Sequence, residues 1–454
     1  MEKIVRIVGG GLAGSEAAWQ LARRGAAVEL FEMRPGRRTE AHATGDLGEL
    51  VCSNSLRSNS LSAGAGLLKE EMRRLDSLVI RVAESTRVPA GSALAVDRGR
   101  FARALTDAVD ALANVRIIRQ EIQEIPNGVA ILATGPLTSA ALSRRLASLL
   151  GEQHLYFYDA ISPIVTAESI DMSVAFKASR YGRDGDDYLN LPLTRDQYYR
   201  FVDALLLAER VPTHSFERFV AFEGCMPIEE MADRGKETLA FGPMRAVGLI
   251  DPRTGKRPYA AVQLRQENRD KTLYNLVGFQ TKMTYPEQRR VLALIPGLER
   301  AEFARLGSLH RNTFINAPLH LMATLQWRQR SSLFFAGQMT GVEGYVESAA
   351  TGLLAGINAA RVLAGEPAVV PPETTALGAL LRYIADPERK NFQPMNVNFG
   401  LIPPLKTPLG RNAKKEMMAR RALADMDSWV REMGGSGSGF NLDLTSSCGT
   451  AVAR

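Results

Sequence analysis

The stretch IVRIVGGGLAGSEAAWQLARRGAAVELFE, residues 4–32, decides the fold of this chain. A short apolar run ends in a glycine-rich turn, small and apolar residues then recur at helical spacing, and a second apolar run follows. Gly9, Gly11 and Gly14 form the pattern G-x-G-x-x-G, and Glu32 stands at the end of the second run. Backbone amides at such a helix N-terminus can approach a pyrophosphate, and the carboxylate can accept hydrogen bonds from a ribose. The stretch therefore predicts a strand-helix-strand unit that binds a dinucleotide.

Two further motifs favour FAD over NAD as that dinucleotide. ILATGP, residues 131–136, is a buried-strand pattern stopped by Thr-Gly-Pro, and FFAGQMTGVEGYVESAATGLLAG, residues 334–356, combines a strand, a glycine turn and a helix. They resemble the middle Ala-Thr-Gly motif and the C-terminal flavin motif of flavoproteins with two dinucleotide-binding domains. Gln338 follows Gly337 where Asp is common, which points to a subfamily rather than to a disulfide reductase. Small residues in the helix allow two interpretations, ligand contact and close helix packing.

The expected fold class is α/β, a Rossmann-type FAD-binding domain with an inserted α+β domain. We expect the FAD-binding domain to span residues 1–165 and 306–433, because the next strand pattern of the sheet appears only near residue 331. Residues 166–305 are expected to form the inserted, substrate- or RNA-facing domain, and residues 434–454 a flexible Gly/Ser-rich tail. The residues expected to hold the cofactor are Gly9, Gly10, Gly11, Leu12, Ala13, Gly14, Glu32, Arg34, Thr134, Gly135, Gly337, Gln338, Gly341, Glu343, Gly344 and Tyr345.

Composition narrows the class of protein. The chain has 454 residues, three cysteines and a formal net charge of +7. Widely spaced cysteines in an odd number do not form a disulfide framework, so a reducing, cytoplasmic location is expected. The sequence contains no apolar run long enough to span a membrane, and no metal site is predicted. The positive charge permits an RNA partner, although a solvated basic surface is an equally ordinary interpretation. Nothing in the sequence decides the oligomeric state.

Two cysteines are candidates for chemistry. Cys52 lies in ELVCSNSLR, residues 49–57, among polar residues and one arginine, a setting that suggests a reactive thiolate if these neighbours fold around it. Cys225 lies in FEGCMPIEEM, residues 222–231, whose apolar residues are more natural around a buried structural cysteine. Taken alone, the residues therefore favour Cys52 as a functional thiol.

The motifs together resemble one family. The blocks that carry the resemblance, beside those already quoted, are LLKEEMRRLDSLV, VPAGSALAVDR, FEGCMPIEEMA and LVGFQTKMTYPEQRRVL. At these separations the sequence is similar to the folate- and FAD-dependent tRNA (uracil-5-)-methyltransferase family, TrmFO. The resemblance implies methylation of uridine 54 in the T loop of tRNA at C5, with 5,10-methylenetetrahydrofolate as the one-carbon donor. It also implies that FAD carries the one-carbon unit and that NADH or NADPH is the reductant.

The same resemblance assigns both Cys52 and Cys225 to catalysis. Uracil C5 is a poor nucleophile, and adding a thiolate to C6 makes C5 reactive. One cysteine is then the nucleophile and the other accepts the C5 proton, and which does which stays open. Tyr345 is a further candidate neighbour of the flavin. Lys282, in GFQTKMT, could meet a folate carboxylate or could be a solvated surface lysine.

Several alternatives remain at this level. The nearest are a 23S rRNA methyltransferase of the same architecture and the related wobble-uridine modification flavoprotein, which has no such pair of cysteine blocks. A small-molecule flavin oxidoreductase and a non-catalytic FAD-binding scaffold belong to different classes. Candidate RNA contacts are four arginine-rich pieces, EMRPGRR, RDQYYR, DPRTGKRP and GRNAKKEMMARRA. A base in a folded tRNA loop would have to be extruded to reach the cofactor.

Overall fold

The computed structural model describes residues 4–39, 41–151, 155–180, 187–211, 226–389, 392–405 and 410–435. Cys225 lies outside these residues. Of the predicted tail, residues 434 and 435 form the end of helix α13 (Arg411–Gly435) and the rest is also outside. Among the helices of the described ranges, none is both long and apolar enough to cross a lipid bilayer.

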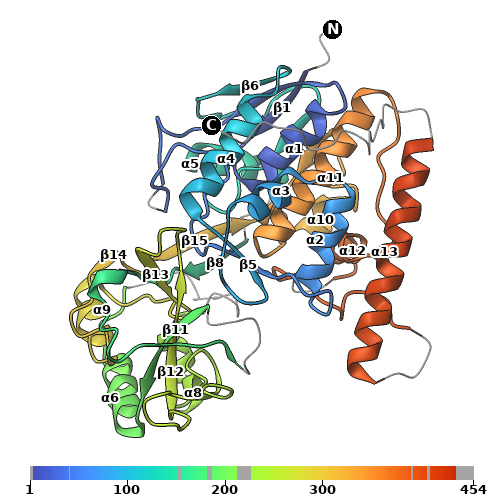
Figure 1. Cartoon of the computed structure of the whole chain (residues 1–454). Helices are drawn as coiled ribbons and strands as arrows, with labels where there is room; N and C mark the ends of the chain where they lie inside the picture. The colour runs from blue at the N-terminus through green and yellow to red at the C-terminus, as the bar shows by residue number, and fades with distance from the viewer. Residues whose placement is uncertain are drawn as a thin grey trace.

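A six-stranded sheet forms the frame of the larger part of the molecule (Figure 1). In sheet order its strands are β16 (Gln326–Trp327), β17 (Arg330–Phe335), β7 (Ala130–Leu132), β1 (Ile4–Val8), β2 (Ala27–Phe31) and β6 (Val115–Ile118). All neighbours are parallel except β16 and β17. Val8 pairs with both Phe31 and Leu132, and Leu132 pairs with Phe335, so four strands end at one edge. The three glycine motifs follow directly after that edge, as ligand sites do in open parallel sheets.

Helices cover this sheet and share one hydrophobic core with it. They are α1 (Leu12–Ala22), α2 (Gly64–Arg74), α3 (Leu78–Ser85), α4 (Arg98–Asp110), α5 (Ala140–Leu150), α10 (Ala317–His320), α11 (Tyr345–Leu363), α12 (Ala376–Ala385) and α13. The closest approach is that of α1 and α11, where a Cβ on Gly352 would lie 2.1 Å from the carbonyl oxygen of Ala13. A Cβ on Gly356 would lie 2.8 Å from that of Ala17. Of the two interpretations of these glycines, the structure supports close helix packing.

A second, antiparallel sheet has a separate core (Figure 1). In sheet order its strands are β10 (Phe176–Lys177), β11 (Tyr188–Leu193), β12 (Ala260–Gln266), β13 (Leu273–Leu276), β9 (Ile164–Thr166) and β14 (Phe303–Arg305). The helices packed against it are α6 (Arg195–Leu206), α7 (Ile228–Asp233), α8 (Thr238–Phe241) and α9 (Tyr285–Leu292). The chain enters and leaves this part through a two-stranded ribbon of β8 (Leu155–Ala160) and β15 (Leu309–Phe314). The structure also contains a small three-stranded sheet. In sheet order its strands are β3 (Ser55–Ser58), β5 (Ala93–Val96) and β4 (Arg87–Val88).

Candidate functional site

A cavity of about 1010 Å³ opens at the carboxyl edge of the parallel sheet. Its walls come from the three glycine motifs and from the end of β2. The predicted cofactor residues that line it are Gly9, Gly11, Leu12, Ala13, Glu32, Arg34, Thr134, Gly135, Gly337, Gln338 and Tyr345. An added Cβ on Gly11 or Gly135 would meet no atom within 4 Å, so both glycines present bare backbone to the cavity. No side chain caps the N-terminus of α1, which leaves its first N–H groups available for an anion.

Three of the predicted cofactor residues, Gly10, Gly14 and Gly341, do not line this cavity. Gly10 donates its N–H to the Oε2 atom of Glu32 at 2.9 Å, and a Cβ on Gly10 would collide with Leu47. A Cβ on Gly14 would lie 1.8 Å from the carbonyl oxygen of Gly9, and Gly341 packs on the ring of Phe392. These glycines shape the turns around the cavity without lining it. The remaining two, Glu343 and Gly344, line a second cavity.

The carboxylate of Glu32 is held by Arg34. Its Oε1 atom accepts from the backbone N–H and the Nε of Arg34, both at 2.9 Å, and its Oε2 atom accepts from Arg34 Nη2 at 3.1 Å and from Gly10. Burial alone would raise the pKa of Glu32, but hydrogen bonds and charge from Arg34 outweigh it and lower that pKa. Four hydrogen bonds use the acceptor sites of a carboxylate, so a ribose hydroxyl must replace an Arg34 N–H to bind Glu32.

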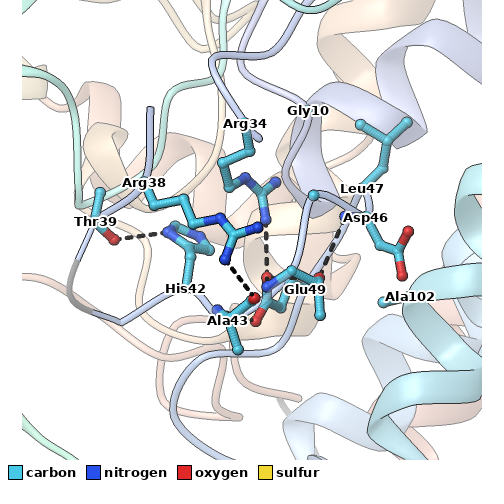
Figure 2. Close-up of polar contacts among 12 residues, drawn as sticks. Gly10, Arg34, Arg38, Thr39, His42, Ala43, Asp46, Leu47, Glu49 and Ala102 are labelled. Carbon is cyan, nitrogen blue, oxygen red and sulfur yellow. Dashed lines mark hydrogen bonds and ion pairs between the residues drawn. The ribbon is translucent and has the colours of Figure 1, made fainter. Parts of the chain in front are cut away.

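Arg34 also anchors the loop that forms one wall of the cavity. Figure 2 shows Arg34 pointing at Glu49, which it meets at 3.1 Å. Glu49 in turn accepts from the backbone N–H of Ala43 at 2.8 Å, and the ring of His42 lies 2.7 Å from the hydroxyl of Thr39 (Figure 2). Because Arg34 is 2% exposed and bridges two carboxylates, it ties the end of β2 to the segment that leads to Cys52.

Cys52 lies in a second cavity of about 1040 Å³ that adjoins the first. The two cavities share part of their walls, namely Val51, Pro136, Leu137, Gln338 and Tyr345. A thiol and a candidate dinucleotide site that are far apart in sequence are therefore neighbours in space.

Tyr345 fixes the backbone at Cys52. Its hydroxyl oxygen accepts from the N–H of Cys52 at 2.8 Å and from that of Ser53 at 3.2 Å. Burial, and the neighbouring Cys52, raise the pKa of the Tyr345 hydroxyl, so it stays neutral. Arg305 holds the same segment from the other side, donating to the carbonyl oxygens of Val51 at 3.0 Å and Cys52 at 3.3 Å. The backbone at Cys52 is thus restrained without use of its sulfur.

The positive charge around Cys52 comes from distant parts of the chain. Arg98 of α4 donates to the carbonyl of Leu50, Arg265 of β12 donates to Ser53 Oγ at 2.8 Å, and Arg305 ends β14. Burial lowers the pKa of Arg265, and burial with the charge of Arg98 lowers that of Arg305 to about 10. Arg98 is paired with the buried Glu267 at 3.1 Å, so Arg265 and Arg305 supply the net positive charge at this end of the cavity.

The sequence neighbours of Cys52 are divided between its cavity and the protein interior. Asn54 is fully buried and accepts from Arg265 Nε at 2.9 Å, whereas Arg57, which has a φ of 62°, lines the Cys52 cavity and pairs with Glu347 at 3.2 Å. Ser55 accepts from the backbone N–H of Arg57. Of the four expected neighbours, Ser53, Ser55 and Arg57 therefore line the same cavity as Cys52, and Asn54 does not.

Glu347 lines the Cys52 cavity, although the sequence does not predict it as a site residue. It is fully buried, its Oε1 accepts from Val397 N at 3.1 Å as well as from Arg57, and its Oε2 has no hydrogen-bond partner in the part of the chain that the structure describes. A Cβ on Gly344, which lines the same cavity, would lie 2.4 Å from that free oxygen. Burial raises the pKa of Glu347, although the charge of Arg57 and the hydrogen bond from Val397 oppose that shift. In sequence it resembles an ordinary acidic residue in the first turn of a helix.

Two other expectations concern the second sheet. Cys225 is outside the described residues, but Ile228, three residues later, donates its N–H to the carbonyl of Gln280 at 2.7 Å, and Gln280 lines the Cys52 cavity. Lys282 is not a solvated surface lysine, because it is largely buried and forms an ion pair with Glu230. Its charge is neutralised within the protein rather than aimed at a folate carboxylate.

The fold and the paired cavities define a Rossmann-type α/β protein of the FAD-binding class, as the sequence predicts. The profile of the family "Glucose inhibited division protein A" matches residues 4–367. Two solved structures of GidA from Aquifex aeolicus match this chain with TM-scores of 0.68 and 0.67 at 17% and 16% identity. Both alignments cover 95% of this chain, and they cover 73% and 80% of the respective GidA chains.

Sequence relatives identify the family more narrowly. The methylenetetrahydrofolate--tRNA-(uracil-5-)-methyltransferase TrmFO of Geobacter sulfurreducens is 58% identical over 432 residues, which cover 95% of this chain and 99% of the relative. That of Moorella thermoacetica is 59% identical over 425 residues, covering 93% and 97%. The chain belongs to the TrmFO family, and the resemblance seen in the motifs is confirmed.

Proposed function

We propose that this protein methylates C5 of a uridine in tRNA, with 5,10-methylenetetrahydrofolate as the one-carbon donor and FAD as cofactor. The observation that carries the proposal is the shared wall between the Cys52 cavity and the cavity at the glycine motifs. Relatives that are named for this reaction cover nearly the whole chain, which supports the proposal. The finer expectations are uridine 54 of the T loop as the target and NADH or NADPH as the reductant.

The residues at the first cavity suit FAD. The uncapped start of α1 and the bare backbone of Gly11 and Gly135 would hold the pyrophosphate, and Glu32 the ribose. The Gly337–Tyr345 turn would face the flavin, because its residues Gln338 and Tyr345 line both cavities. When bound, FAD would carry the one-carbon unit and would supply the reducing equivalents.

The chain's own residues would prepare the uracil ring. A thiolate that adds to C6 makes C5 nucleophilic, and the guanidinium groups of Arg265 and Arg305 hold the segment that carries Cys52. After C5 has taken up the one-carbon unit, a base removes the C5 proton and the sulfur leaves C6. Cys52 and Cys225 are the proposed pair for these two roles, and Glu347 stands in the same wall as a proton donor or acceptor. Residues 166–305 are proposed to face the RNA.

Label transfer tests the proposed function. Purified protein is incubated with FAD, NADH or NADPH, and methylenetetrahydrofolate labelled in its one-carbon unit. Unmodified tRNA and a 23S rRNA fragment are offered separately, and the labelled nucleoside is mapped. The account predicts 5-methyluridine at position 54 of tRNA. Label only in the rRNA fragment would assign the alternative substrate, and reductant oxidation without label in either RNA would favour a small-molecule flavin oxidoreductase.

A further inference from the structure

A third, smaller cavity of about 630 Å³ adjoins the Cys52 cavity on the side of the second sheet. The two share Ala41 and Ile161 in their walls. Its other walls come from helix α9, from β14 and from the segment after β14, which lie together in Figure 1. We call it the α9 groove, and it is lined by Ala41, Ile161, Tyr285, Arg289, Phe303, Ala304, Arg305, Leu306 and Ser308.

The outer rim of the α9 groove carries an aromatic ring and a cation. Tyr285 is the first residue of α9 and is 55% exposed, which is unusual for a large side chain with an apolar ring. Arg289 follows four residues later, so both side chains lie on one face of the helix. Arg289 is exposed and has no ion pair or hydrogen bond of its side chain within the described residues, whereas Arg290 is paired with Glu287. The rim thus offers a stacking surface beside an uncompensated charge.

The inner end of the groove is formed by Arg305. Its Nη atoms are engaged with the backbone of Val51 and Cys52, while its Nε is buried and has no hydrogen-bond partner among the described residues. A buried donor of this kind is costly unless something accepts its hydrogen bond. Arg305 therefore connects the α9 groove with the segment that carries Cys52.

We propose that the α9 groove binds a nucleotide that flanks the target uridine in the RNA, its base stacked on Tyr285 and its phosphate beside Arg289. This inference rests on the proposed function. A base extruded into the Cys52 cavity keeps its neighbours one phosphodiester away, and the adjoining α9 groove is where the described walls leave room for one of them. Aromatic rings with adjacent arginines are the usual platform for unstacked bases in single-stranded segments.

This placement revises the expected RNA contacts. Of the arginine-rich pieces with aromatic residues, RDQYYR lies in α6, but its Tyr198 is fully buried and the hydroxyl of Tyr199 is hydrogen bonded to Glu237. Those rings belong to the protein interior and its hydrogen-bond network. The exposed ring of Tyr285 is the better stacking surface.

The test compares Arg289→Gln and Tyr285→Leu with the wild-type chain and with Arg290→Gln as matched control. Binding of unmodified tRNA is measured by fluorescence anisotropy, without folate, at several salt concentrations. Both groove variants should bind about tenfold more weakly. Arg289→Gln should also reduce the slope of log K against log salt by about 0.7 to 0.9. Arg290→Gln should stay within about twofold of wild type, and Tyr285→Phe should restore binding because it keeps the ring.

Steady-state kinetics separate this proposal from a folate site. The KM for tRNA should rise in the groove variants and the KM for methylenetetrahydrofolate should not change. Wild-type binding by Arg289→Gln and Tyr285→Leu would overturn the proposal, as would an equal loss in Arg290→Gln. A raised KM for folate with unchanged tRNA binding would assign the groove to the folate tail instead. If the wild-type chain labels no RNA at all, the proposed function fails, whereas the groove is decided by the binding data.

Discussion

Tyr345 shows how single residues join the two halves of the site. Its hydroxyl accepts from two backbone N–H groups at Cys52 and Ser53, and these lie almost 300 positions away in sequence. The same ring lines both cavities. A turn that carries a thiol is thereby fixed to the start of α11, where the glycine motif ends.

Tyr345→Phe should therefore loosen the turn at Cys52 without removing the ring. Two part-buried N–H groups lose their acceptor, which lowers the free energy of unfolding by about 1 kcal/mol and by about 3 kcal/mol at most. We expect that loss in urea denaturation, together with roughly tenfold slower methyl transfer and retained FAD. Tyr274→Phe is the control, because that tyrosine is largely buried and its hydroxyl forms no hydrogen bond within the described residues. Equal stability and activity in Tyr345→Phe and wild type would refute this role.

Local sequence predicted residue character better than residue contacts. The polar, cationic setting of Cys52 is expected from its sequence neighbours, of which Ser53, Ser55 and Arg57 line its cavity, but further guanidinium groups come from Arg98, Arg265 and Arg305. These arginines come close to one another only when both sheets have formed, so no local sequence pattern predicts their contacts. Glu347 was missed for the same reason, since its burial depends on the segment that contains Val397.

Helix α2 shows that charged residues in a helix can be buried rather than exposed to solvent. The sequence predicts a charged helix near Leu67 to Leu75, and α2 has that position, yet Lys69 and Glu71 within it are fully buried. Lys69 donates to three successive backbone carbonyls of residues 56–58, which follow Cys52. Burial lowers the pKa of Lys69 to about 7. Charged residues of a helix are thus used to hold other elements in place.

Glu71 caps a different helix and gives a pH-dependent prediction. It accepts from the N–H groups of Ala376 and Leu377 at 2.7 and 2.9 Å, at the start of α12. Burial raises its pKa from 4.5 to about 8. The folded chain then binds this proton more tightly than the unfolded chain, so the stability that it contributes is lost progressively as the pH rises from 4.5 to about 8.

The quantity to follow is the free energy of unfolding of wild type minus that of Glu71→Gln. This difference should fall by roughly 1–3 kcal/mol between pH 6 and pH 9. Chemical denaturation at several pH values measures this difference. Glu70→Gln, which removes a partly exposed carboxylate from the same helix, should follow the wild-type profile. A wild-type minus Glu71→Gln difference that is constant with pH would show that Glu71 does not titrate in this way.

For the whole molecule, the sequence predicts the fold class and the family because both depend on short motifs. G-x-G-x-x-G, Ala-Thr-Gly and the last glycine turn each follow a strand of one parallel sheet, so local patterns place them at the same edge. The adjoining Cys52 cavity could not be derived in this way. It needs Arg265 from the second sheet and Arg305 from the end of strand β14, and their approach is a property of the folded chain.

The central claim is that a one-carbon unit passes from folate to C5 of a tRNA uridine at the cavity that holds Cys52. Cys52→Ala tests it cleanly, because the hydrogen bonds recorded at Cys52 use its backbone and not its sulfur. Wild type and variant are incubated with 13C-labelled methylenetetrahydrofolate, NADH and unmodified tRNA, and the nucleosides are analysed by mass spectrometry. The account predicts 13C in 5-methyluridine with wild type and none with Cys52→Ala, although both proteins retain equal FAD. Full labelling by Cys52→Ala, or no labelled uridine with wild type, would contradict it.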